Sequence, residues 1–178
     1  MARRNNHCTV NSPARRSTYC LALILGILIS ASADAATLSL IPARSETGQG
    51  EKLSVSVNIT GAADLFSAPF YIKYDPRHLK VVSVKQGDFL KQGGVNTAFL
   101  HRERTPGMVM VGLSRLGNRS GVNGSGTLAT LTFITLGAGH TVISLSKSDL
   151  KDSQLAPAKV RIENTTIAIR SALGGQVK

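Results

Sequence analysis

The sequence predicts an all-β protein built as a jelly-roll sandwich of about nine short strands. From about residue 36 onward, short runs recur in which apolar residues occupy every second position, and this is the period of a half-buried strand. Turn-forming residues separate the runs at intervals of roughly 8–12 residues. No segment after the N-terminal region repeats its apolar residues with a helical period. Together these observations predict a single layered β domain.

The clearest hairpin in the sequence supplies two of the expected strands. Phe70, Ile72 and Tyr74 alternate with other residues, which predicts a strand with these three side chains on its inner face. Asp75-Pro76 then ends the strand, because proline has no N–H for a ladder and aspartate can bond its own backbone in a turn. Residues 79–84 are expected to form the next strand.

The other expected strands follow from the same alternation. Residues 45–50 read as a turn, Gly61 as a strand end, residues 117–126 as a loop and residues 149–157 as irregular. The remaining strands are expected at residues 37–41, 53–60, 96–104, 108–116, 128–136, 141–146, 160–162 and 166–170. The side chains predicted to fill the core are Phe70, Ile72, Tyr74, Leu79, Val109, Val111, Leu131 and Phe133.

Residues 1–35 show the three parts of a secretory signal peptide. Four arginines precede an apolar run at residues 21–29, and Ala33-Asp34-Ala35 has the small-x-small pattern of a cleavage site. The apolar run is shorter than the roughly 20 residues that a membrane-spanning helix needs. We therefore expect a signal peptide at 1–35, a domain at 36–170 and a flexible tail at 171–178. The exported protein would lie in the periplasm, on the cell surface or outside the cell, with no membrane span after cleavage.

Composition limits the chemistry that this chain can carry. Both cysteines, Cys8 and Cys20, lie in the predicted signal peptide, so the exported domain has no disulfide, thiol chemistry or cysteine metal site. The formal net charge is +11. The basic residues are spread thinly along the chain, which indicates solvated strand faces and turns, and a surface for an acidic partner or an anionic polymer is the alternative. Nucleic acid is not expected as a partner, because the chain is exported and no aromatic residues are interleaved with the charges.

Four patterns in the sequence resemble the cohesin domain, the receptor module of cellulosome scaffold proteins. The longest is F-x-I-x-Y-D-P-x-x-L-x-V-x-x-V-x-x-G-x-x-L at residues 70–90. The others are G-x-x-x-x-V-x-V-x-I at 50–59, G-x-L-A-x-L-x-F at 126–133 and I-x-L-x-x-x-x-L-x-D at 143–152. The resemblance implies a nine-stranded jelly roll that binds a dockerin. Dockerins resemble paired EF-hand loops and bring their own calcium, so no metal or other cofactor is expected in this chain.

The resemblance also implies that one sheet face carries the partner-binding site. That face would be built from the strand before the Y-D-P turn and the strand before the loop at 117–126. If the core assignment holds, its outward residues, with Arg115 at the edge, are Ser67, Pro69, Tyr71, Lys73, Met108, Met110, Gly112, Ser114 and Arg115. Cellulosomal cohesins tend to have Asn and Asp where Ser67 and Pro69 stand, and an acid near Arg115. The chain therefore resembles cohesin-like proteins outside cellulosomes more closely, whose partner would be a dockerin-like module or another envelope or secreted protein.

One other class of function remains open, and a further one is not expected. A carbohydrate-binding module shares the jelly-roll architecture, but such modules usually present a row of exposed aromatic residues. This chain has no Trp, and only Tyr71, with Phe66 or Phe99, is expected to be free to stack on a sugar. An enzyme is not expected, because the spacings of His78, His101 and His140 match no metal or triad signature.

Overall fold

The computed structural model describes residues 35–117 and 119–171. All of the predicted signal peptide except Ala35, and all of the predicted tail except Ser171, lie outside these residues. The described part of the chain contains twelve strands and one 3₁₀ segment. They are β1 (Ala36–Pro42), β2 (Glu46–Gly48), β3 (Lys52–Ser67), β4 (Phe70–Lys73), β5 (Leu79–Gln86), η1 (Phe89–Gly94), β6 (Thr97–Thr105), β7 (Met108–Arg115), β8 (Val122–Thr135), β9 (Gly139–Ser148), β10 (Lys151–Asp152), β11 (Val160–Glu163) and β12 (Thr165–Arg170).

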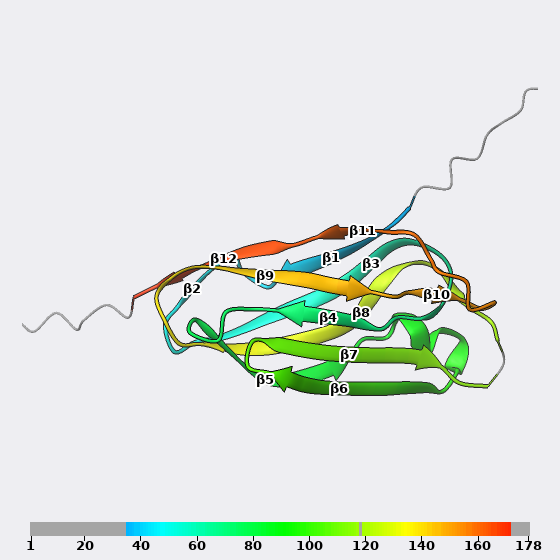
Figure 1. Ribbon diagram of the computed structural model, residues 1–178, viewed down its shortest axis with the longest axis horizontal. Helices are drawn as coiled ribbons and strands as arrows, with labels where there is room; N and C mark the ends of the chain where they lie inside the picture. Colours follow the sequence, from blue (N-terminus) through cyan, green and yellow to red (C-terminus); the bar gives the residue numbers. More distant parts are fainter. Residues whose placement is uncertain (1–34, 118, 172–178) are drawn as a thin grey trace, which may run out of the picture. The chain divides into compact units, whose positions relative to one another are not determined.

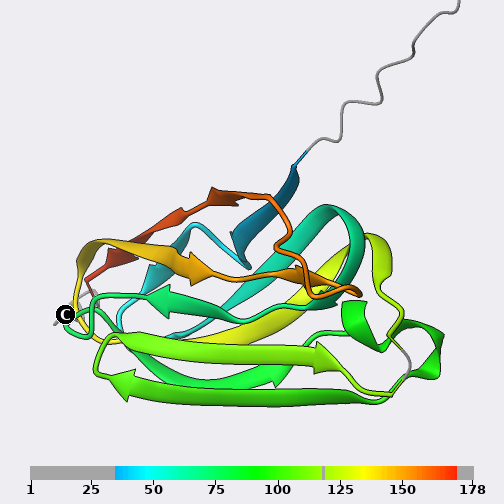
Figure 2. The same cartoon turned by 45° about the vertical axis from the view of Figure 1, so that its right-hand side comes forward.

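The strands form two layers that are continuous at one point. One layer has the order β11-β1-β3-β8-β5, and the other has the order β6-β7-β4-β9-β12-β2. The layers join where the end of β3 reaches β7, through the pair Ser67 and Ser114. In both ribbon views β9, β4, β7 and β6 lie side by side (Figure 1), with β3, β8 and β5 behind them (Figure 2). The arrangement confirms the predicted jelly-roll sandwich.

The core between the layers is apolar and follows the predicted alternation. Along β4 and β7 every second residue is buried, as expected for strands with one face against a core. The rings of Tyr74 and Phe133 meet edge to face, with centroids 5.3 Å apart. All eight predicted core residues are buried, which confirms the face assignment: Phe70, Ile72, Tyr74, Leu79, Val109, Val111, Leu131 and Phe133.

Two strands, β3 and β8, extend well beyond the bounds that the sequence predicts. Gly61 does not end β3, because both Gly61 and Asp64 adopt positive φ values, 68° and 54°. These residues shift the register against β8 and allow the strand to bend and continue to Ser67. The strand that pairs with β3 here, β8, already begins at Val122, inside the segment that was expected to be a loop.

The strand count exceeds nine mainly because of two short pairings in segments read as a turn and as irregular. β10 is two residues long and pairs with the end of β3. β2 is three residues long and pairs in parallel with β12. Thr47 in β2 is buried, and the Arg170 Nε lies 3.0 Å from the Glu46 Oε1. A local turn pattern cannot predict such pairings, because the strands that they pair with are far away in the sequence.

Within the described residues, no helix is long and apolar enough to cross a membrane.

Candidate functional site

Four neighbouring strands, β9, β4, β7 and β6, build the sheet face that the sequence predicts for partner binding. β4 pairs with β9 on one side and β7 on the other, and β7 pairs with β6. In the β4–β7 pair, Tyr71 lies opposite Met110 and Lys73 lies opposite Met108. Directly opposed residues place their side chains on the same face of a sheet. These four side chains therefore form one cluster on the outer face.

Eight of the nine predicted site residues are half-buried or exposed, so they are accessible from the surface. Lys73 is exposed and the other seven are half-buried. Ser67 and Ser114 lie toward the end of the face where the two layers join, and the Ser67 hydroxyl donates to the Leu113 carbonyl at 3.4 Å. The eight are Ser67, Pro69, Tyr71, Lys73, Met108, Met110, Gly112 and Ser114. Their role in binding a partner stays a prediction.

The expected position of Arg115 at the surface edge is wrong. Arg115 is only 5% exposed. It lies on the inward side of β7, as do Val109, Val111 and Leu113. The Arg115 Nη1 donates to the Leu90 carbonyl at 2.8 Å and to the Gln92 carbonyl at 3.1 Å. The guanidinium therefore fixes η1 against the end of β7.

Two cationic residues that the sequence analysis missed reach this face through β-bulges. Glu103 pairs with Val109 and Thr105 with Met108, so Arg104 between them is an extra residue in β6. Lys147 is likewise extra in β9, between residues that pair with β4, and its φ is 53°. Bulges re-aim side chains and are frequent beside functional sites. A left-handed φ is sterically costly for a residue with a Cβ.

Two further missed residues, Leu100 and Arg102, could not have been found from the hairpin at residues 105–108 alone. Continued from Thr105 and Met108 without a bulge, the register would pair Arg102 with the buried Val111. The bulge at Arg104 shifts it by one residue, so that Leu100 lies opposite Gly112 and Arg102 opposite Met110. Leu100 is 61% exposed. Gly112 leaves the space beside it open, since an added Cβ would come no closer than 3.9 Å to the Leu100 carbonyl oxygen.

The surface of this face is hollowed at two adjoining places. The first hollow is lined by Arg102, Arg104 and Met110. The second crosses all four strands and is lined by Tyr71, Lys73, Arg104, Met108, Ser146 and Lys147. Arg104 belongs to both hollows. Each hollow thus combines methionine side chains with cationic groups.

The charge on the face is positive and has no compensation from the described residues. No Asp or Glu lines either hollow. The one acid on the neighbouring part of β6, Glu103, is engaged elsewhere, because the Tyr74 hydroxyl donates to its Oε1 at 2.6 Å. Burial, followed by this hydrogen bond, raises the pKa of Tyr74 to about 12. Tyr74 therefore stays protonated and continues to hold Glu103.

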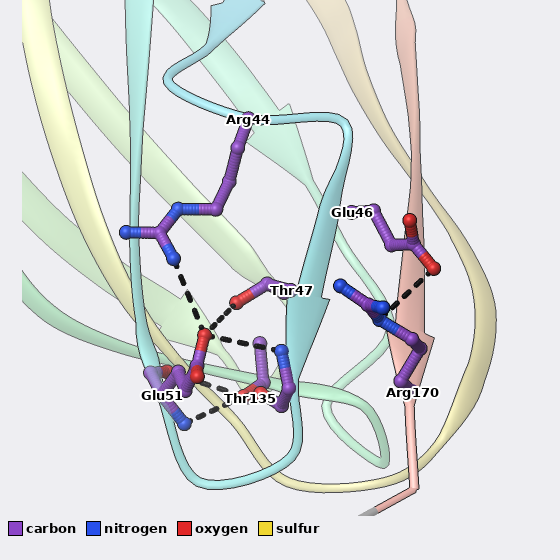
Figure 3. Close-up of polar contacts among 7 residues, drawn as sticks. Arg44, Glu46, Thr47, Glu51, Thr135 and Arg170 are labelled. Atoms are coloured by element: carbon purple, nitrogen blue, oxygen red, sulfur yellow. Dashed lines mark hydrogen bonds and ion pairs between the residues drawn. The ribbon is translucent and has the colours of Figure 1, made fainter.

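A polar cluster where β2, β3 and β8 meet has a structural explanation (Figure 3). The Glu51 Oε2 accepts hydrogen bonds from the Thr47 hydroxyl at 2.9 Å, the Gly48 amide at 3.1 Å and Arg44 at 3.3 Å. The Thr135 hydroxyl donates to the Gly48 carbonyl at 2.6 Å. The Gly48 amide, and next the Thr47 hydroxyl, lower the pKa of Glu51. The carboxylate stays ionised and fastens β2, so it is not suited to donate a proton in catalysis.

Metal-binding clusters are not found in the described part of the chain. Within residues 35–117 and 119–171, no group of three or more His, Cys, Asp or Glu could hold a metal ion. His101 lies on β6 and His140 on β9, while His78 follows the Asp75 turn, where its Nδ1 lies 3.3 Å from the Asp75 Oδ2.

Fold and surface together define a small β-sandwich module whose accessible feature is an open sheet face. The family model for the cohesin domain matches residues 39–169. This match spans well over half of the chain, so the chain belongs to the cohesin family. Comparison with curated protein sequences gives no significant match.

Solved structures of similar fold include cohesins of different origin. A non-cellulosomal cohesin from the archaeon Archaeoglobus fulgidus is 24% identical, with a TM-score of 0.65, over 77% of this chain and 92% of that one. The sixth cohesin of scaffoldin B from Acetivibrio cellulolyticus, in complex with a dockerin, is 22% identical, with a TM-score of 0.65, over 76% and 99%. A cohesin module of a Clostridium perfringens family 33 glycoside hydrolase is 13% identical, with a TM-score of 0.63, over 78% and 98%. At these identities the likeness establishes the fold.

Proposed function

We propose that this protein is an exported, non-catalytic module that binds a partner protein through the outer face of β9, β4, β7 and β6. The observation that carries the proposal is the pair of adjoining hollows on this face, which place Met108, Met110 and Tyr71 beside four cations. Partly exposed methionines on one sheet face suit a binding surface, since the methionine side chain adapts to irregular partners. Export rests on the signal-peptide pattern of residues 1–35.

The family supports a protein as the partner. Cohesin domains are binding modules, and solved cohesins have been captured in complex with dockerins from Acetivibrio cellulolyticus and Clostridium thermocellum. For this chain we propose a dockerin-like module, or another secreted or envelope protein. Any calcium would be carried by the partner, since the proposed site is built from sulfur, aromatic and cationic groups, which do not suit this ion.

A carbohydrate ligand has less support from this face. Binding sites for sugars usually present several rings for stacking, whereas Tyr71 is the one aromatic residue that lines the two hollows. Phe99 lies on the inward side of β6, opposite Leu113, and packs against the core. We therefore retain carbohydrate as the alternative that the following experiment has to separate.

The test is a quantitative pull-down from the secreted and envelope fractions of the source organism, with the protein immobilised. Parallel samples contain calcium or a calcium chelator, and others contain soluble polysaccharide as competitor. We expect one or a few proteins to be enriched and to resist the polysaccharide. Retention only with calcium would identify a dockerin-like partner. Loss of every captured protein on adding polysaccharide would instead support the carbohydrate alternative and contradict the proposal.

A further inference from the structure

We propose that the partner segment that docks on this face is acidic, with carboxylates flanking an apolar side chain. The inference rests on the proposed function and specifies its partner. Its basis is the grouping of Lys73, Arg102, Arg104 and Lys147 around the two methionines. Each of these cations is exposed.

The four cations have no anionic partner within the described part of the protein. Ion pairs occupy other basic residues there, such as Arg77 with Asp75 and Lys91 with Asp88. By contrast, none of the ion pairs or side-chain hydrogen bonds among the described residues involves Lys73, Arg102, Arg104 or Lys147. Like charges gathered on one face repel each other, so an incoming carboxylate gains from all four.

Backbone geometry shows that two of these charges occupy irregular positions. Arg104 and Lys147 are the extra residues of bulges in β6 and β9, the two outer strands of the face. Lys147 also holds a φ of 53°, a conformation in which glycine would be less strained. Strain of this kind at a non-glycine residue points to a functional requirement for its side chain. The bulges bring a cation from each side toward the central pair of strands.

The apolar lining favours an acidic protein segment over an anionic polysaccharide. Met108, Met110 and the ring of Tyr71 lie on the same face as the cations. A sulfated or phosphorylated polymer would satisfy the cations and leave the methionines unused. A peptide that places an aliphatic side chain between two carboxylates would engage both kinds of group.

The methionines also provide the reporters for the test. The chain has three methionines, Met1, Met108 and Met110, so methyl labelling of methionine places two signals on this face. The probe is a short synthetic peptide with glutamates on both sides of a leucine. Its glutamine counterpart, its serine-for-leucine counterpart and dextran sulfate serve as comparison ligands. We expect the glutamate–leucine peptide to shift both face methyl signals, and the glutamine peptide to leave them unchanged.

Two matched double variants test whether the local charges cause the binding. The double variant Lys73→Gln with Lys147→Gln should lower the affinity for the peptide by roughly two- to thirtyfold, the range expected for two exposed ion pairs. Lys80→Gln with Lys85→Gln removes the same charge from β5 in the other layer and should change the affinity less than twofold. Equal losses in the two variants would mean attraction to net charge alone and would overturn the inference. Methyl shifts with dextran sulfate as strong as with the peptide would overturn it in favour of a polyanion.

A single variant separates the strain at Lys147 from its charge. Lys147→Gly should keep or raise the melting temperature, because glycine accepts the left-handed backbone. The same variant should lower the affinity for the peptide. If the Lys147→Gly protein binds the peptide with unchanged affinity, the bulged Lys147 side chain does not contribute to binding, and its proposed role is contradicted. The two proposals can fail separately. A protein from the pull-down whose binding requires Met110 but does not depend on Lys73, Lys147 or salt would uphold the proposed binding face and reject the acidic segment.

Discussion

Tyr71 and Met110 lie directly opposite each other on the paired strands β4 and β7, and both point away from the core. Their neighbours in sequence, Phe70 and Val111, are also paired and are fully buried. The same two strands therefore carry a packed core on one side and an accessible surface on the other. This relationship predicts that stability and partner binding can be changed independently by substituting adjacent residues.

Phe70→Ala and Tyr71→Ala should differ sharply in their effect on stability. Phe70 is fully buried, and truncating a buried phenylalanine typically costs about 3–5 kcal/mol. Tyr71 is half-buried on the outer face, so its truncation should cost less than about 1 kcal/mol. Urea unfolding of the two variants measures the difference. Similar losses in both would show that the two faces have been assigned wrongly.

Arg115→Ala should destabilise the fold. The substitution leaves the Leu90 and Gln92 carbonyls without the guanidinium that now donates to them, and an unsatisfied buried polar group costs about 1–3 kcal/mol. Arg102→Ala provides the matched control, because Arg102 is exposed and its loss should change stability by no more than about 0.5 kcal/mol. A larger loss of stability for the control than for Arg115→Ala, measured by thermal unfolding, would refute the anchoring role.

Stability should fall in acid partly because of Asp64, which links β3 to two loops. Its carboxylate accepts hydrogen bonds from the Ser153 hydroxyl and amide and from the Gly121 amide at 2.9 Å. The Ser153 hydroxyl is the main cause that lowers the pKa of Asp64 in the folded protein. The unfolded chain therefore binds more protons as the pH falls below about 4. This contribution to stability is complete above that pH and is lost as the pH drops through the folded pKa.

Asp64→Asn should consequently flatten the dependence of unfolding free energy on pH in the acid range and lower stability at neutral pH. Asp88→Asn is the control, since the Asp88 side chain is 92% exposed and pairs only with Lys91 among the described residues. Denaturant unfolding at neutral and acid pH checks both variants. An Asp64→Asn protein that loses stability in acid as steeply as the parent would refute the assignment.

The layers and the core could be predicted from the sequence because local alternation determines which side chains are buried. Phe70, Ile72 and Val109 lie in strands with a regular period of two, and the structure buries each of them. The continuation of β3 past Gly61 could not be predicted in this way. Positive φ values at Gly61 and Asp64 turn a predicted strand end into a bend, and only the distant pairing with β8 stabilises it.

The candidate face was predicted less completely than the core. Alternation places Tyr71, Lys73, Met108 and Met110 correctly outside, but the same argument continued to Arg115 would have placed it inside. The cohesin resemblance instead led to the prediction that Arg115 lies at the surface edge. That prediction is wrong, because Arg115 is buried. Arg104 and Lys147 escaped prediction because a bulge adds one residue to a strand, and this changes the face on which the side chain lies.

The measurement that most directly tests the account is the effect of Met110→Asp on capture of the partner. The substitution puts a carboxylate at the centre of the proposed surface, where it would oppose an acidic segment. We expect binding of the protein identified by pull-down to weaken by more than tenfold, about 1.4 kcal/mol, with the melting temperature nearly unchanged. The control is Val82→Asp, which changes an exposed apolar residue on β5 in the other layer and should leave binding intact. Undiminished binding by the Met110→Asp protein, or loss in the Val82→Asp protein instead, would contradict the claim that this face recognises the partner.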